Sequence, residues 1–159
     1  MKKLLSCLFT VLIATPIMAA HHALAKEEVY AAIEGFDDAY ATNEVETYFA
    51  YYSEGADLFF LGQRQGISAY HEEWSVMVEP GGRVEKNDIL DVNIRVLLGG
   101  ESTIATYFVD YASVLPDGDR VVAKAFELEV WQSIDGKWQI VSLHYLEIKL
   151  EQYPVATFS

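Results

Sequence analysis

The chain has 159 residues, 52% of them hydrophobic, and carries a formal net charge of −13 at pH 7. This length suits a single domain of ordinary size. The acidic excess argues against nucleic acids and anionic membrane surfaces as partners, because both would repel a strongly negative protein.

The N-terminus has the pattern of a secretory signal peptide. Lys2 and Lys3 precede an apolar run over residues 4–20, and the small-residue sequence ALA ends at Ala25. The run is short for a membrane span and is interrupted by Pro16. We therefore expect residues 1–25 to be removed during export to the periplasm or out of the cell.

Removal of this leader would leave a single domain of residues 26–159 with no membrane contact. The one cysteine, Cys7, would go with the leader, so no disulfide would stabilise the mature domain. Loss of Lys2 and Lys3 would leave 9 basic residues against 24 acidic ones, a net charge of −15.

Three helices are predicted in the first half of the chain. Apolar residues recur at helical spacing in residues 26–42, with acidic residues on the opposite side. A shorter helix is predicted within residues 43–53, followed by a buried strand at residues 56–62. A third helix is predicted over residues 66–82, where Pro80 and two glycines end it.

The second half of the chain alternates with the period of β-strands. Four strands are predicted, at residues 84–98, 101–115, 120–133 and 137–149. The dipeptides between them, Gly99-Gly100, Asp117-Gly118 and Asp135-Gly136, are typical of tight hairpin turns. Helices followed by an antiparallel meander predict an α+β fold.

If each dipeptide is a two-residue loop, the turns set the register of the sheet, and the register decides which side chains share a face. Counting outward from the turns predicts a mixed face with three central rows: Asp91, Phe108, Glu127, His144; then Asn93, Thr106, Glu129, Ser142; then Arg95, Ile104, Trp131, Ile140. Asp110 lies one row further on the same face. The opposite face is almost entirely apolar, with Tyr107, Phe126, Leu128, Val141 and Leu143 among its residues.

Two arrangements fit these rows. In the first, the apolar face packs on the helices, and Glu127 and Glu129 are solvated. In the second, the helices cover the mixed face and leave a pocket over its polar centre, while a second copy of the chain buries the apolar face. Large apolar residues on the mixed face, such as Trp131, favour the second arrangement.

The sequence ELEVW at residues 127–131, followed by DGKWQIV and the LH pair that ends at His144, resembles the nuclear-transport-factor-2-like, or SnoaL-like, superfamily. Within it, the chain is most similar to the association (hub) domain of calcium/calmodulin-dependent protein kinase II and its bacterial relatives. The resemblance covers residues 26–149.

The resemblance implies a cone-like α+β barrel, with three N-terminal helices packed on a curved antiparallel sheet. It places a pocket on the concave face, with Glu129, Ser142 and His144 pointing into it, and a homodimer contact on the convex face. The hub-domain pocket is basic, whereas the matching positions here are Glu129 and Tyr145, so anion binding is not implied.

The first hypothesis is a homodimeric binding module whose pocket takes a small, mostly apolar molecule with one or two polar groups. Its candidate ligand-binding residues are Asn93, Thr106, Glu129, Ser142, Trp74 and Tyr40. Another possibility is that the domain only mediates assembly.

The second hypothesis is a cofactor-independent lyase, isomerase or cyclase. Glu127 beside His144 would orient the imidazole and raise its pKa, with Asp110 nearby, so these three are the candidate catalytic residues. We predict no metal, because strand rows with a single histidine give poor ligand geometry, and no cofactor, because no nucleotide-binding motif is present.

Overall fold

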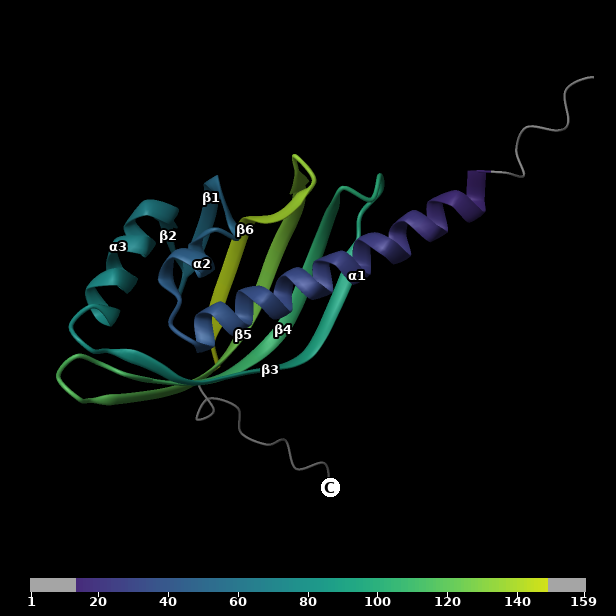
Figure 1. Ribbon diagram of the computed structural model, residues 1–159. Coiled ribbons are helices and arrows are strands. Elements are labelled where there is room, and N and C mark those ends of the chain that lie inside the picture. Colours follow the sequence, from purple (N-terminus) through teal and green to yellow (C-terminus); the bar gives the residue numbers. More distant parts are fainter. Residues whose placement is uncertain (1–13, 149–159) are drawn as a thin grey trace, which may run out of the picture.

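The computed structural model describes residues 14–148 and has the predicted α+β architecture (Figure 1). Its elements are α1 (Ala14–Ala41), α2 (Val45–Phe49), β1 (Tyr52–Phe60), β2 (Gln63–Gly66), α3 (Ile67–Val78), β3 (Arg83–Val96), β4 (Ser102–Val114), β5 (Arg120–Ile134) and β6 (Lys137–Glu147). The short strand β2 was not predicted.

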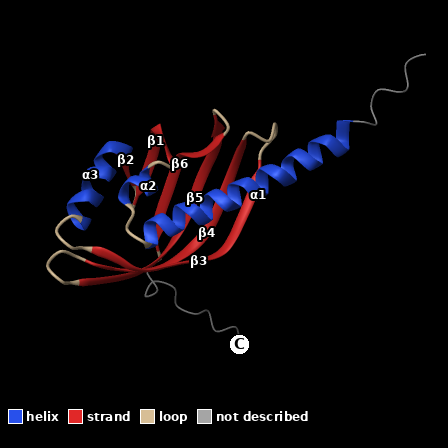
Figure 2. Ribbon diagram, in the orientation of Figure 1, coloured by secondary structure: helices blue, strands red, loops and turns tan. Residues whose placement is uncertain are grey.

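The strands form one curved sheet in the order β2-β1-β6-β5-β4-β3 (Figure 2). Strand β1 runs parallel to β6, and all other neighbouring strands are antiparallel. The sheet has two free edges and does not close into a barrel. Helix α1 crosses one face of it, and α2 and α3 lie at the β1–β2 end (Figure 1). We call the covered face the inner face and the opposite face the outer face.

Helix α1 includes residues 26–41 of the predicted helix and begins earlier in the chain. Val29, Ile33 and Phe36 recur at helical spacing and are buried in the core. Residues 14–25, the described part of the predicted signal peptide, continue the same helix and are rich in alanine, the best helix former. Residues 1–13, which include Cys7, lie outside the described residues.

No helix within residues 14–148 combines the length and the apolar character that a membrane span requires.

Aromatic rings fill the space between the three helices. Phe36 of α1 stacks on Tyr48 of α2, with ring centroids 4.5 Å apart. Tyr40 stacks on Trp74 of α3 at 5.0 Å, and Trp74 meets Tyr48 edge to face at 4.6 Å. These contacts hold α2 and α3 against the end of α1, and they place Tyr48 and Trp74 on the inward sides of their helices.

The register between β4 and β5 differs from the prediction by one residue. The Leu115 amide donates a hydrogen bond to the Asp119 carbonyl at 2.8 Å, so the loop comprises three residues, Pro116–Gly118, and not two. Gly118 has a φ of 92°, the left-handed conformation that such a loop requires. Glu127 therefore lies opposite Tyr107 and not opposite Phe108. A one-residue slip reverses the face of every side chain on the neighbouring strand.

Two bulges alter the remaining rows. The Asp135-Gly136 turn has the predicted register, but the pairing of β5 and β6 shifts by one residue between Val130 and Trp131. Glu127 consequently pairs with Tyr145 and not with His144. Between β3 and β4, Asn93 pairs with Thr106 as predicted, and the pairing then shifts so that Leu90 lies opposite Phe108.

The register breaks leave β5 on its predicted face and reverse much of β4 and β6. Glu127, Glu129 and Trp131 lie on the inner face, as predicted for the pocket. Their inner-face neighbours come from the set that was predicted to form the apolar dimer face: Tyr107, Leu143 and Tyr145. The prediction that Tyr107 and Leu143 belong to an interface is therefore wrong, because both are buried beneath the helices.

Candidate functional site

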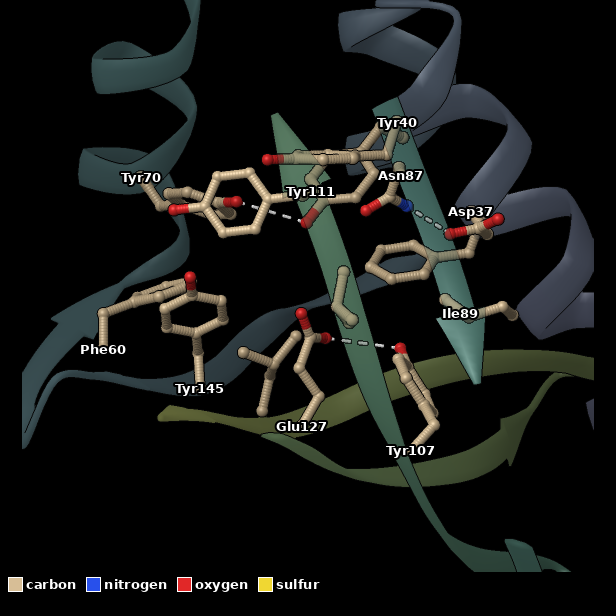
Figure 3. Close-up of a pocket in the computed structure, with 14 residues that line it drawn as sticks. Asp37, Tyr40, Phe60, Tyr70, Asn87, Ile89, Tyr107, Tyr111, Glu127 and Tyr145 are labelled. Atoms are coloured by element: carbon tan, nitrogen blue, oxygen red, sulfur yellow. Dashed lines mark hydrogen bonds between the residues drawn. The ribbon is translucent and has the colours of Figure 1, made fainter. Parts of the chain in front are cut away.

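A cavity of about 80 Å³ lies between the inner face of the sheet and the helices (Figure 3). This volume holds several water molecules or one small ligand. Most of its wall is aromatic: Phe36, Tyr40, Tyr48, Phe60, Tyr70, Tyr107, Tyr111 and Tyr145. The remaining wall is formed by Asp37, Asn87, Ile89, Val109, Glu127 and Leu143.

Strand β5 places Glu127 in the cavity wall, because every second side chain of a strand points to the same face of the sheet. The Glu127 carboxyl points into the space that the tyrosines surround (Figure 3). Its Oε2 atom accepts a hydrogen bond from the Tyr107 hydroxyl at 3.3 Å, across the β4–β5 pair. Tyr107 is the one donor to this carboxyl among the residues that the structure describes, which leaves capacity for a ligand.

Glu129 lies two residues further along β5 and is fully buried, with 0% of its surface exposed. Its Oε2 atom accepts a hydrogen bond of 2.7 Å from the Trp131 indole nitrogen. Its Oε1 atom is buried and has no hydrogen-bond partner within residues 14–148. An unpaired buried carboxylate oxygen is costly, which favours the neutral acid.

The two glutamates have raised pKa values. Burial is the largest cause for both, and repulsion by Glu129 raises the pKa of Glu127 further. The hydrogen bonds from Tyr107 and Trp131 oppose the shift, since both stabilise a charged carboxylate. Each carboxyl thus keeps its proton to a higher pH than an exposed glutamate would.

A third acid, Asp37 of α1, lies at another part of the cavity wall. The Asn87 side-chain amide of β3 donates a hydrogen bond to its Oδ1 atom (Figure 3). Burial, followed by repulsion from Asp38 and Asp88, raises the pKa of Asp37 to about 6. The cavity is therefore acidic in character, although its acids are partly protonated near neutral pH.

The tyrosines connect the cavity to the helices through their hydroxyl groups. The Tyr48 hydroxyl lies 2.8 Å from that of Tyr52 and 3.2 Å from that of Tyr70. The Tyr145 hydroxyl is buried and has no partner within the described residues. Burial raises the pKa of the phenols well above the ordinary tyrosine value, so they stay neutral: Tyr40, Tyr48, Tyr52, Tyr70, Tyr107 and Tyr145.

The cavity includes some of the predicted ligand-binding residues and excludes others. Tyr40 lines it, Glu129 lies beside Glu127 on the same face, and Trp74 packs behind Tyr40. The other three predicted ligand-binding residues lie on the outer face: Asn93, Thr106 and Ser142. The prediction that these three face the pocket is wrong, because the register breaks reverse β3, β4 and β6 there.

The predicted catalytic residues are not brought together. Glu127 is inside, whereas His144 is exposed on the outer face, where its ring stacks on Phe59 at 4.6 Å. Asp110 is also on the outer face, where Lys86 lies 3.0 Å and Lys124 3.7 Å from its carboxylate. The predicted pairing of Glu127 with His144 is wrong, and the described residues offer no support for a mechanism that needs it.

Sequence reasoning did not find Asp37, Asn87 or the tyrosines of β4 and β6 as lining residues. The Pro-Asp-Gly sequence at residues 116–118 could have revealed the tyrosines of β4, since it is typical of a three-residue turn with a left-handed glycine. No group of three or more His, Cys, Asp or Glu that could hold a metal ion occurs in residues 14–148.

The family model for the calcium/calmodulin-dependent protein kinase II association domain matches residues 25–147. No curated protein matches the chain.

Solved structures with the same fold include two domains related to this kinase and one bacterial protein. The hub homology domain from Chlamydamonas reinhardtii is 22% identical, with a TM-score of 0.62 over 77% of this chain and 97% of that one. The C. elegans association domain is 20% identical, with a TM-score of 0.62 over 79% and 97% of the two chains. An NTF2-like protein from Cytophaga hutchinsonii is 13% identical, with a TM-score of 0.68 over 77% and 98%.

Proposed function

Because the chain belongs to the calcium/calmodulin-dependent protein kinase II association-domain family, we propose that it is an exported, homodimeric domain whose inner cavity binds a small molecule. The observation that carries the binding proposal is a cavity with unused polar capacity. The Tyr145 hydroxyl lines the cavity without a hydrogen-bond partner in residues 14–148, and Glu127 meets only Tyr107 there. Buried polar groups without partners are rare in folded proteins, and a ligand would satisfy these.

A native mass spectrum of the purified protein tests this proposal. We expect a bound small molecule that is released on denaturation. The variant Ile89→Phe, which enlarges a side chain in the cavity wall, should lose the bound molecule. The matched control is Leu90→Phe, because Leu90 is the next residue of β3 and is 48% exposed on the outer face. Equal occupancy in both variants, or none in the parent protein, would contradict the proposal.

The dimer proposal rests on an apolar row across the outer face. Leu90, Phe108, Phe126 and Leu146 pair in sequence across four adjacent strands, β3 to β6. Leu90, Phe108 and Leu146 are exposed by 48%, 41% and 59%, and the Phe108 and Phe126 rings touch edge to face at 5.6 Å. A contiguous apolar surface of this kind favours burial against another protein. We call these four residues the outer apolar row.

Replacing a residue of the outer apolar row with a charge tests the dimer. Phe108→Glu should convert a dimer to a monomer in size-exclusion chromatography with light scattering. Leu98→Glu is the control, because Leu98 is 91% exposed in the β3–β4 loop and lies outside the row. A Phe108→Glu variant that remains dimeric would assign the interface to another surface.

The export proposal rests on the leader pattern of residues 1–25 and is supported by a family match that begins at residue 25. The mature helix would then begin with Lys26-Glu27-Glu28, and acidic residues in a first turn are stabilising. Intact-mass measurement of protein from the periplasm or culture medium should show a chain that begins at residue 26. A full-length chain confined to the cytoplasm would refute export.

A further inference from the structure

We propose that the ligand of the cavity is a small organic ammonium ion, held by the aromatic wall and by the carboxylate of Glu127. This inference deepens the proposed binding function and rests on it. Three features of the cavity lead to it: the sign of its ionisable groups, the kind of surface around them, and the absence of a metal-binding geometry in residues 14–148.

The first feature is charge. Within residues 14–148, the side chains that line the cavity include the acids Asp37 and Glu127 and no lysine, arginine or histidine. A carboxylate or phosphate ligand would lie beside the Asp37 and Glu127 carboxyls, with no basic lining side chain within residues 14–148 to balance its charge. Like charges in a low-dielectric cavity are strongly unfavourable, whereas a cation would be attracted by the carboxylate.

The second feature is the aromatic surface. Six tyrosines and two phenylalanines contribute to the wall, and the face of an aromatic ring carries partial negative charge. Aromatic rings arranged around a site bind alkylated ammonium groups through cation–π attraction, which strengthens when water is excluded. Apolar side chains such as Val109 and Leu143 in the same wall would contact the alkyl groups of such an ion.

The third feature separates an organic cation from a metal ion. A metal ion needs several oxygen, nitrogen or sulfur ligands around one point. No such group of three or more His, Cys, Asp or Glu occurs in the described part of the chain. A cavity of about 80 Å³ is also larger than a bare ion requires.

Binding would also change the protonation of Glu127. In the free protein, burial and repulsion by Glu129 raise the pKa of Glu127, which favours its neutral form. A bound cation favours the carboxylate, so the proton of Glu127 would leave to solvent as the ligand enters. The positive charge of the ligand would replace that of the proton, which leaves the net charge of the site unchanged.

Three isosteric probes test the ligand class: choline, its neutral analogue 3,3-dimethylbutan-1-ol, and the anion 3,3-dimethylbutanoate. Their affinities for the full purified protein would be measured by isothermal titration calorimetry at constant ionic strength. We expect choline to bind at least tenfold more tightly than the alcohol, and the anion to bind most weakly. Glu127→Gln should reduce choline affinity at least tenfold and leave that of the alcohol unchanged.

Asp110→Asn is the matched control, because it removes a carboxylate from the outer face. It should leave all three affinities unchanged, and circular dichroism would confirm that both variants fold. The inference is overturned if the alcohol or the anion binds as tightly as choline, or if Glu127→Gln leaves choline affinity intact. If choline does not bind while the native mass spectrum still shows a molecule lost in Ile89→Phe, the ligand class is wrong but the binding function stands. Failure of both experiments would refute the binding function itself.

Discussion

Strand β5 presents Glu127, Glu129 and Trp131 to the inner face of the sheet, whereas the residues between them on the outer face are apolar. The same holds more widely: the inner face encloses carboxyls and phenols, and the outer face exposes Leu90, Phe108 and Leu146. Both features depart from the usual distribution, in which carboxyls are exposed and large apolar side chains are buried. The binding proposal rests on the inner-face carboxyls and phenols, and the dimer proposal rests on the outer-face apolar side chains.

The largest expected difference between the faces is in packing. Trp131 is 0% exposed and donates a hydrogen bond to Glu129, so Trp131→Ala would open a cavity and leave Glu129 without its donor. We expect a loss of about 3 to 5 kcal/mol in the free energy of unfolding, measured by urea denaturation.

Phe108→Ala is the outer-face counterpart of that substitution. Measured on monomeric protein, it should lower the free energy of unfolding by less than about 1 kcal/mol, because Phe108 is 41% exposed. Similar losses in the two variants would mean that the outer face is as buried as the inner one.

A smaller difference should appear in the pH dependence of stability. The raised pKa of Glu129 means that the folded state holds a proton that the unfolded state releases at lower pH. Stability is therefore full below the ordinary glutamate pKa and falls as pH rises through the folded-state value. Between pH 5 and 9, the free energy of unfolding should therefore fall by about 1 to 3 kcal/mol less in Glu129→Gln than in the parent protein.

The outer-face control for this experiment is Asp110→Asn. Lys86 lowers the pKa of Asp110, so that carboxyl contributes to stability above its ordinary pKa and loses its effect only in more acidic solution. The variant should keep the parent slope between pH 5 and 9. Chemical denaturation across this range is the measurement, and an unchanged slope in Glu129→Gln would refute the assignment.

The next effect concerns ligand binding. If a cation displaces the proton of Glu127, choline affinity should rise with pH by up to tenfold per unit until Glu127 is ionised in the free protein. Asp37 and Glu129 are the other acids that interact with Glu127, and the phenols around it stay neutral. Glu127→Gln should weaken this dependence strongly. Calorimetry in two buffers of different ionisation enthalpy would detect the released proton, and a pH-independent affinity would contradict the exchange.

The smallest effect is expected at His144. Its ring lies on the outer face against Phe59, away from the cavity. His144→Gln should change the free energy of unfolding by less than about 0.5 kcal/mol and leave ligand occupancy unchanged. Loss of the bound molecule in this variant, seen by native mass spectrometry, would show that His144 contributes to ligand binding.

The elements of the fold were predictable because their periodicity is strong. Helix α1, the four long strands and the inner position of Glu127, Glu129 and Trp131 all agree with the sequence pattern. The residues that lie next to these glutamates on the inner face were not predicted. Counting from the turns assigns a residue to the wrong face whenever a loop length is wrong or a bulge lies between the turn and that residue.

The register shift between β5 and β6 is caused by tertiary packing, and the sequence of β6 alone does not predict it. Ile140 and Leu143 are both buried on the inner face, although they are three residues apart. A regular strand would point them in opposite directions, so burying both requires an extra residue between them. The Asp91 φ of 58° marks the similar irregularity in β3. Neither position carries the glycine that would have signalled it.

The three-residue Pro116–Gly118 loop sets the phase between the two halves of the meander. A change of one residue in how Leu115 and Asp119 pair across this loop would present Thr106 and Phe108 to the helices in place of Tyr107. A change of register at this hairpin would therefore change which side chains line the cavity, with no substitution in the strands themselves. Relatives that pair these two strands in another register should have differently lined cavities, even where the aligned strand sequences are the same.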